Sequence, residues 1–449
     1  MKRKLTFKET ILVASTLFGM FFGAGNLIFP VHLGQMAGAN AIPATVGFIV
    51  TAVSIPILGV AAIGITHSEN LLALSSKVSK WYGVVFTSIL YLTIGPFFAI
   101  PRCATTSFTT GFAPLIEGEN TALYQRLFTA VFFAVVWFFS MRPGGIMIWI
   151  GKIINPIFLV FLTVLIAVAL INPSASVFSV APVESYESGA FGNGFVEGYG
   201  TMDAIAGLAF GIIVIDIIRG LGVKNDEDIA KSTIKAGVFT AILMALIYVL
   251  TIVMGAQSRG LFEVSENGGI ALAQISNHYL GTFGNIVLAV TITFACLKTA
   301  IGLVTSCSEM FVTMFPKSLR YKGWATVFTL FSFGIANVGL TTLIGYSVPV
   351  LMLLYPLTIV IIALALSEKL FGGSRRVYAW VTLGAFTAAV FDFMKTLPSG
   401  LIEALHLSPA IGFAGKVFPL FDLGFGWIAP SVIGLVIGLA LTYAGKRKN

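Results

Sequence analysis

Residues 18–30, Phe-Gly-Met-Phe-Phe-Gly-Ala-Gly-Asn-Leu-Ile-Phe-Pro, hold the groups best placed to do chemistry in this chain. Within this apolar stretch, Gly23-Ala24-Gly25-Asn26 interrupts the helical pattern, since glycines lower the cost of leaving the helix. A helix in hydrocarbon must satisfy its own backbone groups, so irregular backbone survives there only inside protein or beside a watery cavity. The pattern therefore predicts a broken helix with backbone N–H and C=O groups free to bind a ligand.

A second apolar stretch, residues 199–218, carries Gly207-Leu-Ala-Phe-Gly211 at its centre. We predict that this glycine pair interrupts the sixth membrane span as Gly23–Asn26 interrupts the first. Paired interruptions are typical of an inverted repeat with a ligand site between its halves. The alternative is that Gly207 and Gly211 only let two helices pack closely.

Two such breaks favour a zwitterionic ligand. Helix amino ends carry partial positive charge and suit a carboxylate, whereas helix carboxyl ends offer carbonyl oxygens to an ammonium group or a small cation. The flanking residues are apolar and predict a pocket for an aliphatic side chain. They are Phe21, Phe22, Leu208, Ala209 and Phe210. A small aliphatic amino acid fits this pattern best.

The eighth span adds a second constellation, Gly302-Leu-Val-Thr305-Ser306. Two neighbouring hydroxyls and a free carbonyl can coordinate a hard cation, and carbonyls of Gly19 and Phe22 from the first break would complete the ligand set. Neutral oxygens suit sodium. The alternative is that the hydroxyls bond back to carbonyls one turn earlier in their own helix.

The composition requires a membrane to hold these elements. Apolar residues make up 57% of the 449 residues and charged residues 10%, and the mean hydropathy is +0.95, far from soluble norms. No soluble domain of useful size is expected. The start of the chain also resembles a secretory signal with a small-residue cleavage site. Its removal would leave an odd number of spans, so we expect it to stay as the first span.

Apolar runs of about 20 residues predict twelve transmembrane helices in one all-α polytopic domain, residues 1–449. The spans are 9–36, 41–66, 81–111, 122–141, 145–171, 199–218, 232–256, 283–311, 323–338, 342–366, 377–395 and 422–444. Of the 27 Lys and Arg residues, only six do not lie at or near a cytoplasmic end when both termini are cytoplasmic. These six are Arg102, Arg126, Arg259, Lys298, Lys395 and Lys416. The positive-inside rule thus places both termini in the cytoplasm, and the net charge of +8 reflects topology rather than nucleic-acid binding.

Several motifs resemble those of bacterial branched-chain amino acid carriers, the leucine-isoleucine-valine cation symporter family. They are spread over nearly the whole chain and comprise Gly23–Pro30, Gly95–Arg102, Thr201–Asp203, Leu208–Gly211, Cys296–Thr305 and Pro419–Trp427. The resemblance implies a LeuT-type fold, a five-plus-five inverted repeat with broken helices 1 and 6. Repeat one would cover about 9–171, repeat two about 199–366, and two added helices about 377–444.

The resemblance further implies sodium-coupled import of leucine, isoleucine and valine across a bacterial inner membrane. No cofactor beyond the coupling sodium and no obligate protein partner are expected. Carried over by motif, the substrate-binding residues would be Gly23, Ala24, Gly25, Asn26, Gly207, Ala209 and Phe210. The sodium ligands would be Gly19, Phe22, Gly302, Thr305 and Ser306.

Lys298 departs from the family pattern, which leads us to expect a small hydroxyl or apolar residue there. It precedes Thr305 by two helical turns, about 10 Å. At an effective dielectric near 20, two unit charges that far apart repel by roughly 1.7 kcal/mol, so a charged Lys298 would weaken sodium binding about tenfold. We expect Asp203 to pair with Arg102 or Lys298 and to help close the outer side of the site. A static ion pair without a gating role is the alternative.

Other functions remain open at this point. Proton coupling through Lys298, Asp203 or Glu309 is an alternative to sodium coupling, since each can titrate when buried. A channel should line a continuous polar path with charge rings or carbonyl filters, and none is evident. A nutrient sensor on the same scaffold is a third possibility. No nucleophile–base pair predicts an enzyme.

Overall fold

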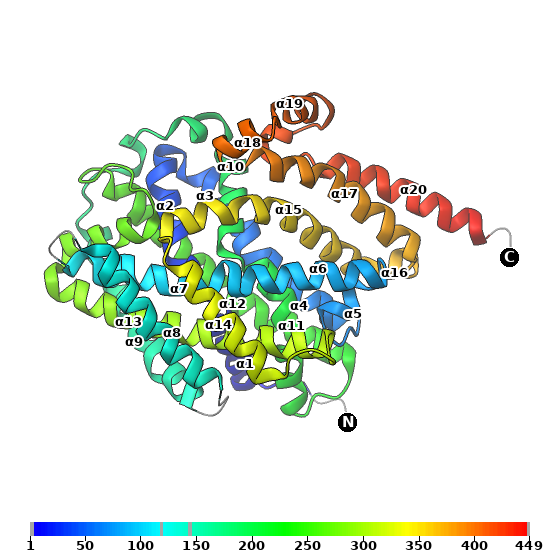
Figure 1. Ribbon diagram of the computed structural model, residues 1–449, viewed down its shortest axis with the longest axis horizontal. Helices are drawn as coiled ribbons and strands as arrows, with labels where there is room; N and C mark the ends of the chain where they lie inside the picture. Colours follow the sequence, from blue (N-terminus) through cyan, green and yellow to red (C-terminus); the bar gives the residue numbers. More distant parts are fainter. Residues whose placement is uncertain (1–3, 117–119, 142–145, 447–449) are drawn as a thin grey trace.

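The computed structural model describes residues 4–116, 120–141 and 146–446, and the described chain is built from helices joined by short connections (Figure 1). Some basic residues counted in the topology prediction lie outside the described residues. They are Lys2, Arg3, Arg142, Arg447 and Lys448.

The first span is broken, as predicted. Helix α1 covers Phe7–Phe21 and begins with a capping box formed by Thr6 and Glu9. Phe22 leaves the helix with extended backbone, and α2 resumes at Gly25 and runs to Ala37.

Three π-helical turns occur in the next two spans. The second span consists of α3 (Ala41–Ile49), the π-helical turn η2 (Val50–Ser54) and α4 (Ile55–Ile65). The third consists of α6 (Lys80–Leu92), the π-helical turn η3 (Thr93–Phe97), α7 (Ala99–Thr106) and the π-helical turn η4 (Ser107–Phe112). Pro96 lies inside η3 and has no N–H to continue the helical ladder. The widened turn before α7 sets the direction of the helix that carries Arg102.

The sixth span is also broken, but not where the glycine pair predicts. Helix α10 (Glu184–Glu197) continues into the 3-10 turn η7 (Gly198–Thr201), Met202 adopts a left-handed conformation with φ of 64°, and α11 runs over Asp203–Gly220. The two halves are bent by 45°. The segment Gly207–Gly211 lies inside regular helix, so the prediction of a break there is wrong. Left-handed backbone is costly for a residue with a Cβ and is concentrated at functional sites.

The remaining elements are mostly long helices. They are α5 (Leu71–Ser75), α8 (Thr121–Ser140), α9 (Ile146–Ile171), α12 (Asp226–Ser258), α13 (Gly268–Met314), α14 (Tyr321–Ala336), α15 (Leu340–Leu366), α16 (Glu368–Phe371), α17 (Arg375–Lys395), α18 (Ser399–Ala404), α19 (Ser408–Val417) and α20 (Ile428–Lys446), with 3-10 turns η1 (Gly38–Asn40), η5 (Ala113–Leu115), η6 (Val177–Ser179) and η8 (Phe421–Leu423). Helix α13 bends at Gly281, whose φ of 62° suits glycine.

The packing brings the two broken spans together around one centre. Helix α2 packs against α12 and α13, α4 packs against α11, and α10 packs against α3. Helix α1 packs chiefly on α12 and α11, whereas α13 packs on α2, α7 and α9. Helices α17 and α20 lie side by side and reach the bundle through α15 (Figure 1).

Seven helices of the described chain are long and apolar enough to cross a membrane, or eight when the bent pair α10–α11 counts as one span. Shorter apolar helices, including Pro156–Ile171 and Ile428–Ala444, fall below that length. The all-helical membrane architecture is confirmed. The count of twelve spans stays a prediction.

Candidate substrate site at the two helix breaks

A small buried cavity lies where the breaks of the first and sixth spans meet. Its volume is about 40 Å³, which is room for two or three water molecules. The lining comes from both breaks and from the third and eighth spans: Met20, Phe21, Gly23, Ala24, Gly25, Asn26, Ile94, Ala99, Arg102, Cys103, Thr201, Met202, Asp203, Ala206, Phe210, Thr299 and Leu303. The walls are apolar except for the backbone of the breaks and a few polar side chains.

Asn26 joins the two breaks. Its side chain is 2% exposed. The Oδ1 atom accepts a hydrogen bond from the Gly23 N–H at 2.9 Å, and the Nδ2 atom donates to Asp203 Oδ2 at 2.5 Å and to the Tyr248 hydroxyl. This one amide therefore satisfies a backbone donor in the first break and fixes the carboxylate that begins α11.

The first break leaves backbone groups free on both of its sides. In a continuous helix the Gly23 N–H would bond to the Gly19 carbonyl, but here Asn26 accepts that proton. On the other side, the first backbone hydrogen bond of α2 is donated by Leu27 to the Ala24 carbonyl, at 3.3 Å. The N–H groups of Gly25 and Asn26, two residues that line the cavity, therefore have no acceptor in the described chain. A helix amino end in this state attracts a carboxylate.

Asp203 is the first residue of α11 and is 3% exposed. Besides Asn26, its Oδ2 atom receives a hydrogen bond from the Tyr248 hydroxyl at 3.5 Å. Its own N–H donates to the Thr201 hydroxyl at 3.3 Å. The carboxylate thus lies in a buried network of neutral donors at a helix amino end, where negative charge is favoured.

Arg102 connects the breaks from the side of α7. Its guanidinium donates to the Gly200 carbonyl at 2.6 Å and lies 5.3 Å from the centre of the Phe29 ring. It also covers Gly25, because a Cβ built on that glycine would lie 2.9 Å from Arg102 Nη2. The expected ion pair between Arg102 and Asp203 does not form: the two lie at the same cavity, but Arg102 bonds to a carbonyl and Asp203 to an amide and a phenol.

Lys298 does not pair with Asp203 either. Its Nζ atom donates to the Gly19 carbonyl at 3.2 Å, the carbonyl that Gly23 leaves free. The next residue, Thr299, lines the cavity and lies beside Gly23. Helix α13 therefore approaches the first break through residues 298 and 299, one turn earlier than the predicted sodium ligands.

Most of the predicted substrate residues lie at the cavity and two do not. Gly23, Ala24, Gly25, Asn26 and Phe210 line it. Gly207 instead faces α4, since a Cβ on it would collide with the Pro56 carbonyl. Ala209 offers its carbonyl to the Tyr91 hydroxyl at 3.2 Å. The close-packing interpretation of this glycine pair is therefore the one that the geometry supports.

The predicted sodium ligands are not assembled into one shell in this structure. The Thr305 hydroxyl accepts a hydrogen bond from Tyr321 at 3.4 Å, and the Ser306 hydroxyl lies beside Tyr91. Gly302 is exposed, with open space where a Cβ would be. The Phe22 ring stacks on Phe18 at 4.8 Å. Of the set, only the Gly19 carbonyl has a cation beside it, and that cation is Lys298.

Sequence reasoning missed Tyr248, Met202 and Thr201 as parts of the site. Gly198 and Gly200 directly before them are a signal that could have found the second break, because small residues in a span permit the chain to leave the helix. Tyr248 carries a weaker signal: it is the one tyrosine of helix α12, which also contains serine and threonine hydroxyls. Its contact with Asn26 joins residues 222 positions apart and has no local signature.

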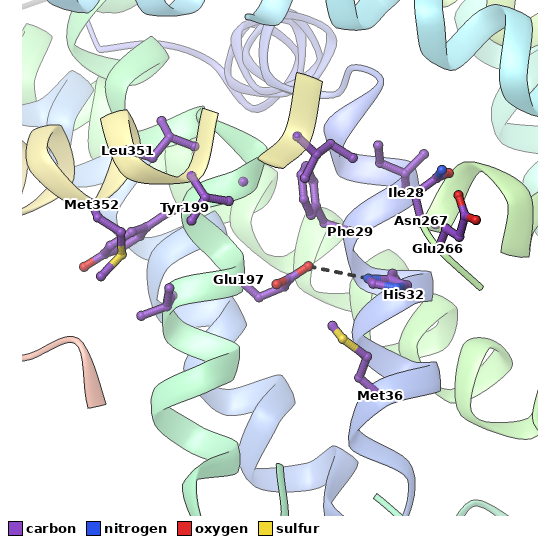
Figure 2. A pocket seen from close by; sticks show the side chains of 15 residues that line it. Ile28, Phe29, His32, Met36, Glu197, Tyr199, Glu266, Asn267, Leu351 and Met352 are labelled. Carbon is purple, nitrogen blue, oxygen red and sulfur yellow. Dashed lines mark ion pairs between the residues drawn. The ribbon is translucent and has the colours of Figure 1, made fainter. Parts of the chain in front are cut away.

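A larger pocket of about 200 Å³ lies on the other side of Arg102 and Phe29. Figure 2 shows its walls, where His32 and Met36 of α2 face Glu197 at the end of α10, and the Tyr199 side chain of η7 lies beside Met352. His32 Nδ1 and Glu197 Oε1 lie 3.9 Å apart across the pocket (Figure 2). Phe29 and Gly200 line this pocket and also contact Arg102. A single layer of Arg102 and Phe29 therefore separates the two cavities.

Two broken helices with free backbone groups around one buried cavity define a membrane transporter of the broken-helix class. Solved structures share this fold. Over 97% of its length the chain resembles a structure described as the inward facing conformation of Mhp1, with a TM-score of 0.62, 14% identity and 91% of that chain covered. A closed conformation of Mhp1, described as a nucleobase-cation-symport-1 family transporter with bromovinylhydantoin bound, gives a TM-score of 0.56 at 12% identity, with coverage of 98% and 93%. The predicted LeuT-type fold is confirmed by this likeness.

The chain belongs to the family described as branched-chain amino acid transport protein, whose model matches residues 6–444. It is 49% identical to the branched-chain amino acid permease BrnQ of Lactobacillus delbrueckii subsp. lactis over the full length of both chains. It is 39% identical to the BrnQ permease of Bacillus subtilis (strain 168), with 98% of each chain covered. The predicted family is confirmed, and the chain is a transporter rather than an enzyme.

Proposed function

We propose that this protein imports leucine, isoleucine and valine by alternating access, driven by a sodium gradient across a bacterial cell membrane with both termini in the cytoplasm. The observation that carries the proposal is the meeting of two helix breaks at one cavity, where Asn26 joins them, in a chain of this family. The permeases of Lactobacillus delbrueckii and Bacillus subtilis, named for branched-chain amino acids, support the substrate class.

The geometry supports one orientation of the substrate. Its carboxylate would bind the free N–H groups at the start of α2, beside the Arg102 guanidinium. Its ammonium group would face the Asp203 carboxylate, which still has oxygen lone pairs to offer. The aliphatic side chain would contact Ile94, Phe210 and Leu303, which line the same cavity.

The cavity of about 40 Å³ is too small for a branched-chain amino acid; an engineered cavity of about 150 Å³ is needed to hold benzene. Binding therefore requires the two halves of a broken span to move apart or side chains to turn away. Arg102 is the side chain in the best position, since it covers Gly25 and contacts Phe29. We assign Arg102 the gating role between the small cavity and the larger pocket, and Asp203 a role in holding the substrate.

Sodium coupling rests on the carbonyls that the first break exposes. Gly19 and Phe22 lie at the end of α1, and Gly302, Thr305 and Ser306 lie on α13, which packs on α2 and not chiefly on α1. Sodium would bind when the end of α1 approaches α13 and brings both sets of oxygens together. The ion would be transported with the substrate. Because neutral carbonyl and hydroxyl oxygens are the ligands of a hard monovalent cation, the donor types fit sodium even though the shell is not assembled.

Proton coupling is a second candidate, and one observation favours it: the Gly19 carbonyl already has the Lys298 ammonium group as its partner. A chain that supplies its own cation at this position has less need of sodium there.

Transport in proteoliposomes tests the proposal. The purified full chain, reconstituted without other proteins, should accumulate radiolabelled leucine when sodium is higher outside. Unlabelled isoleucine and valine should compete, and lysine should not. Accumulation driven equally well by a proton gradient without sodium would reject sodium coupling in favour of the second candidate. Equilibrium binding of leucine without accumulation under either gradient would instead indicate a sensor.

A further inference from the structure

The ammonium group of Lys298 has one hydrogen-bond partner in the described part of the chain, the Gly19 carbonyl. No carboxylate of a described residue forms an ion pair with it, since the ion pairs found involve other lysines and arginines. A charge at membrane depth is costly unless it is partnered or faces water. The Gly19 carbonyl is therefore the group that stabilises the Lys298 ammonium group at this depth.

The Gly19 carbonyl is available for a specific reason. Asn26 accepts the Gly23 N–H that would otherwise bond to it, so the break itself creates the acceptor that Lys298 uses. The same carbonyl lies at the negative end of α1, where a cation is favoured. A small cation that binds to the Gly19 carbonyl must therefore share this oxygen with Lys298 or displace it.

Lys298 also lies on the face of α13 that carries two of the proposed sodium ligands, Gly302 and Thr305. Lys298, Gly302, Thr305 and Glu309 are spaced by four, three and four residues, which places them along one stripe of the helix. All four are exposed or half-buried, in contrast to their neighbours Cys296, Ala300 and Val304. A polar stripe of this kind faces water or a cavity rather than lipid. Water can therefore bring a dissolved cation to the carbonyl that Lys298 contacts.

We propose that Lys298 is a tethered cation that competes with the transported sodium for the Gly19 carbonyl. The proposal rests on the sodium-coupled function proposed above. In the carrier without bound sodium, the ammonium group satisfies the end of α1 through its contact with the Gly19 carbonyl. When sodium binds, the lysine leaves the carbonyl. Lys298 then weakens sodium binding and fills the sodium position in the empty carrier.

Charge removal at Lys298 tests the competition by a binding measurement that does not depend on transport. The purified full-length protein is titrated with sodium at constant ionic strength while its melting temperature is measured. The sodium concentration at half of the total rise in melting temperature is the sodium midpoint. Lys298→Met keeps the length of the side chain without the charge and should lower the sodium midpoint about tenfold or more. Lys298→Arg keeps the charge and should stay within about threefold of the wild type. Lys80→Met removes an exposed lysine at the start of α6 and should leave the midpoint unchanged.

An unchanged or higher midpoint in Lys298→Met would overturn the proposal. So would an absent sodium response in both the wild type and Lys298→Met when both bind leucine. A sodium response that appears only in Lys298→Met would support it, because the lysine then outcompetes sodium in the wild type. Should Lys298→Met fail to fold, Lys298→Gln provides the same charge removal with a polar end. If leucine binding is absent in a wild type whose melting temperature still rises with sodium, the substrate assignment fails while the competition stands.

Discussion

The amide nitrogen of Asn26 lies 2.5 Å from a carboxylate oxygen of Asp203, although the two residues are 177 positions apart in the chain. One residue follows the break in the first span and the other follows the break in the sixth. Their hydrogen bond is the direct link between the two breaks, and Tyr248 of α12 shares it.

Asn26→Ala should abolish this link and weaken leucine binding by more than tenfold. The substitution leaves the Gly23 N–H without a partner and leaves the buried Asp203 carboxylate with the longer hydrogen bond from Tyr248. A lost partner of a buried charged group costs more than a lost surface hydrogen bond. Equilibrium leucine binding to the purified protein measures the effect. Asn285→Ala, at another buried asparagine outside the cavity lining, is the matched control and should bind leucine like the wild type. Equal loss in both variants would show a general folding defect.

Two neighbouring glycines should respond differently to alanine. A Cβ at Gly25 would lie 2.9 Å from Arg102 Nη2 and 3.3 Å from Thr201 Cα. A Cβ at Gly23 would make ordinary contacts, with Thr299 side-chain atoms at 3.5 Å and Asn26 Oδ1 at 3.9 Å. Gly25→Ala should therefore displace Arg102 and reduce leucine uptake at least tenfold, and Gly23→Ala should retain much of the activity. Initial rates of leucine uptake in proteoliposomes compare the pair. Equal activity of the two variants would contradict the close contact between Arg102 and the first break.

Removal of Arg102 should open the small cavity toward the larger pocket. Cys103 provides a native reporter, since it lines the small cavity and is 2% exposed. In a background with Cys296 and Cys307 replaced by alanine, Arg102→Ala should raise the rate at which a membrane-impermeant thiol reagent labels Cys103 by more than tenfold. The background protein with Arg102 intact is the control. Labelling that stays equally slow in both proteins would reject the gating role.

Gly207→Ala should lower stability rather than act selectively on binding. Its Cβ would collide with the Pro56 carbonyl of α4, and overpacking of this kind costs about 1–3 kcal/mol. Gly220→Ala, near the end of the same helix with nothing within 4 Å of the added atom, is the matched control. Melting temperatures should fall for Gly207→Ala only. If Gly207→Ala instead has normal stability and does not bind leucine, Gly207 is part of the substrate site.

The first break could be predicted from local sequence because Gly23-Ala24-Gly25-Asn26 concentrates two glycines and an amide within an apolar run. The sequence predicts the second break at the wrong residues because glycine in a membrane helix can either permit a break or permit close helix packing. Gly207 and Gly211 allow close packing on α4, while the chain breaks at Met202, a residue without any sequence preference for left-handed backbone.

The partners of the charged residues could not be predicted. Asp203 was expected to pair with a cation, because opposite charges are the simplest way to bury both. The structure instead gives each charge a neutral partner that the breaks supply: Asn26 for Asp203, the Gly200 carbonyl for Arg102 and the Gly19 carbonyl for Lys298. These partners are backbone groups or amides made available by tertiary geometry, and they have no signature in composition or spacing.

The layer formed by Arg102 and Phe29 also bears on the kinetics of the carrier. Rotation of the Arg102 and Phe29 side chains alone would connect the small cavity with the larger pocket. Assembly of the proposed sodium shell, in contrast, needs the end of α1 to approach α13. Rotamer changes are generally faster than collective helix movements, which take microseconds to milliseconds. The slow step of the transport cycle is therefore expected in the movement of α1, and temperature should affect turnover through that helix rather than through the barrier at Arg102.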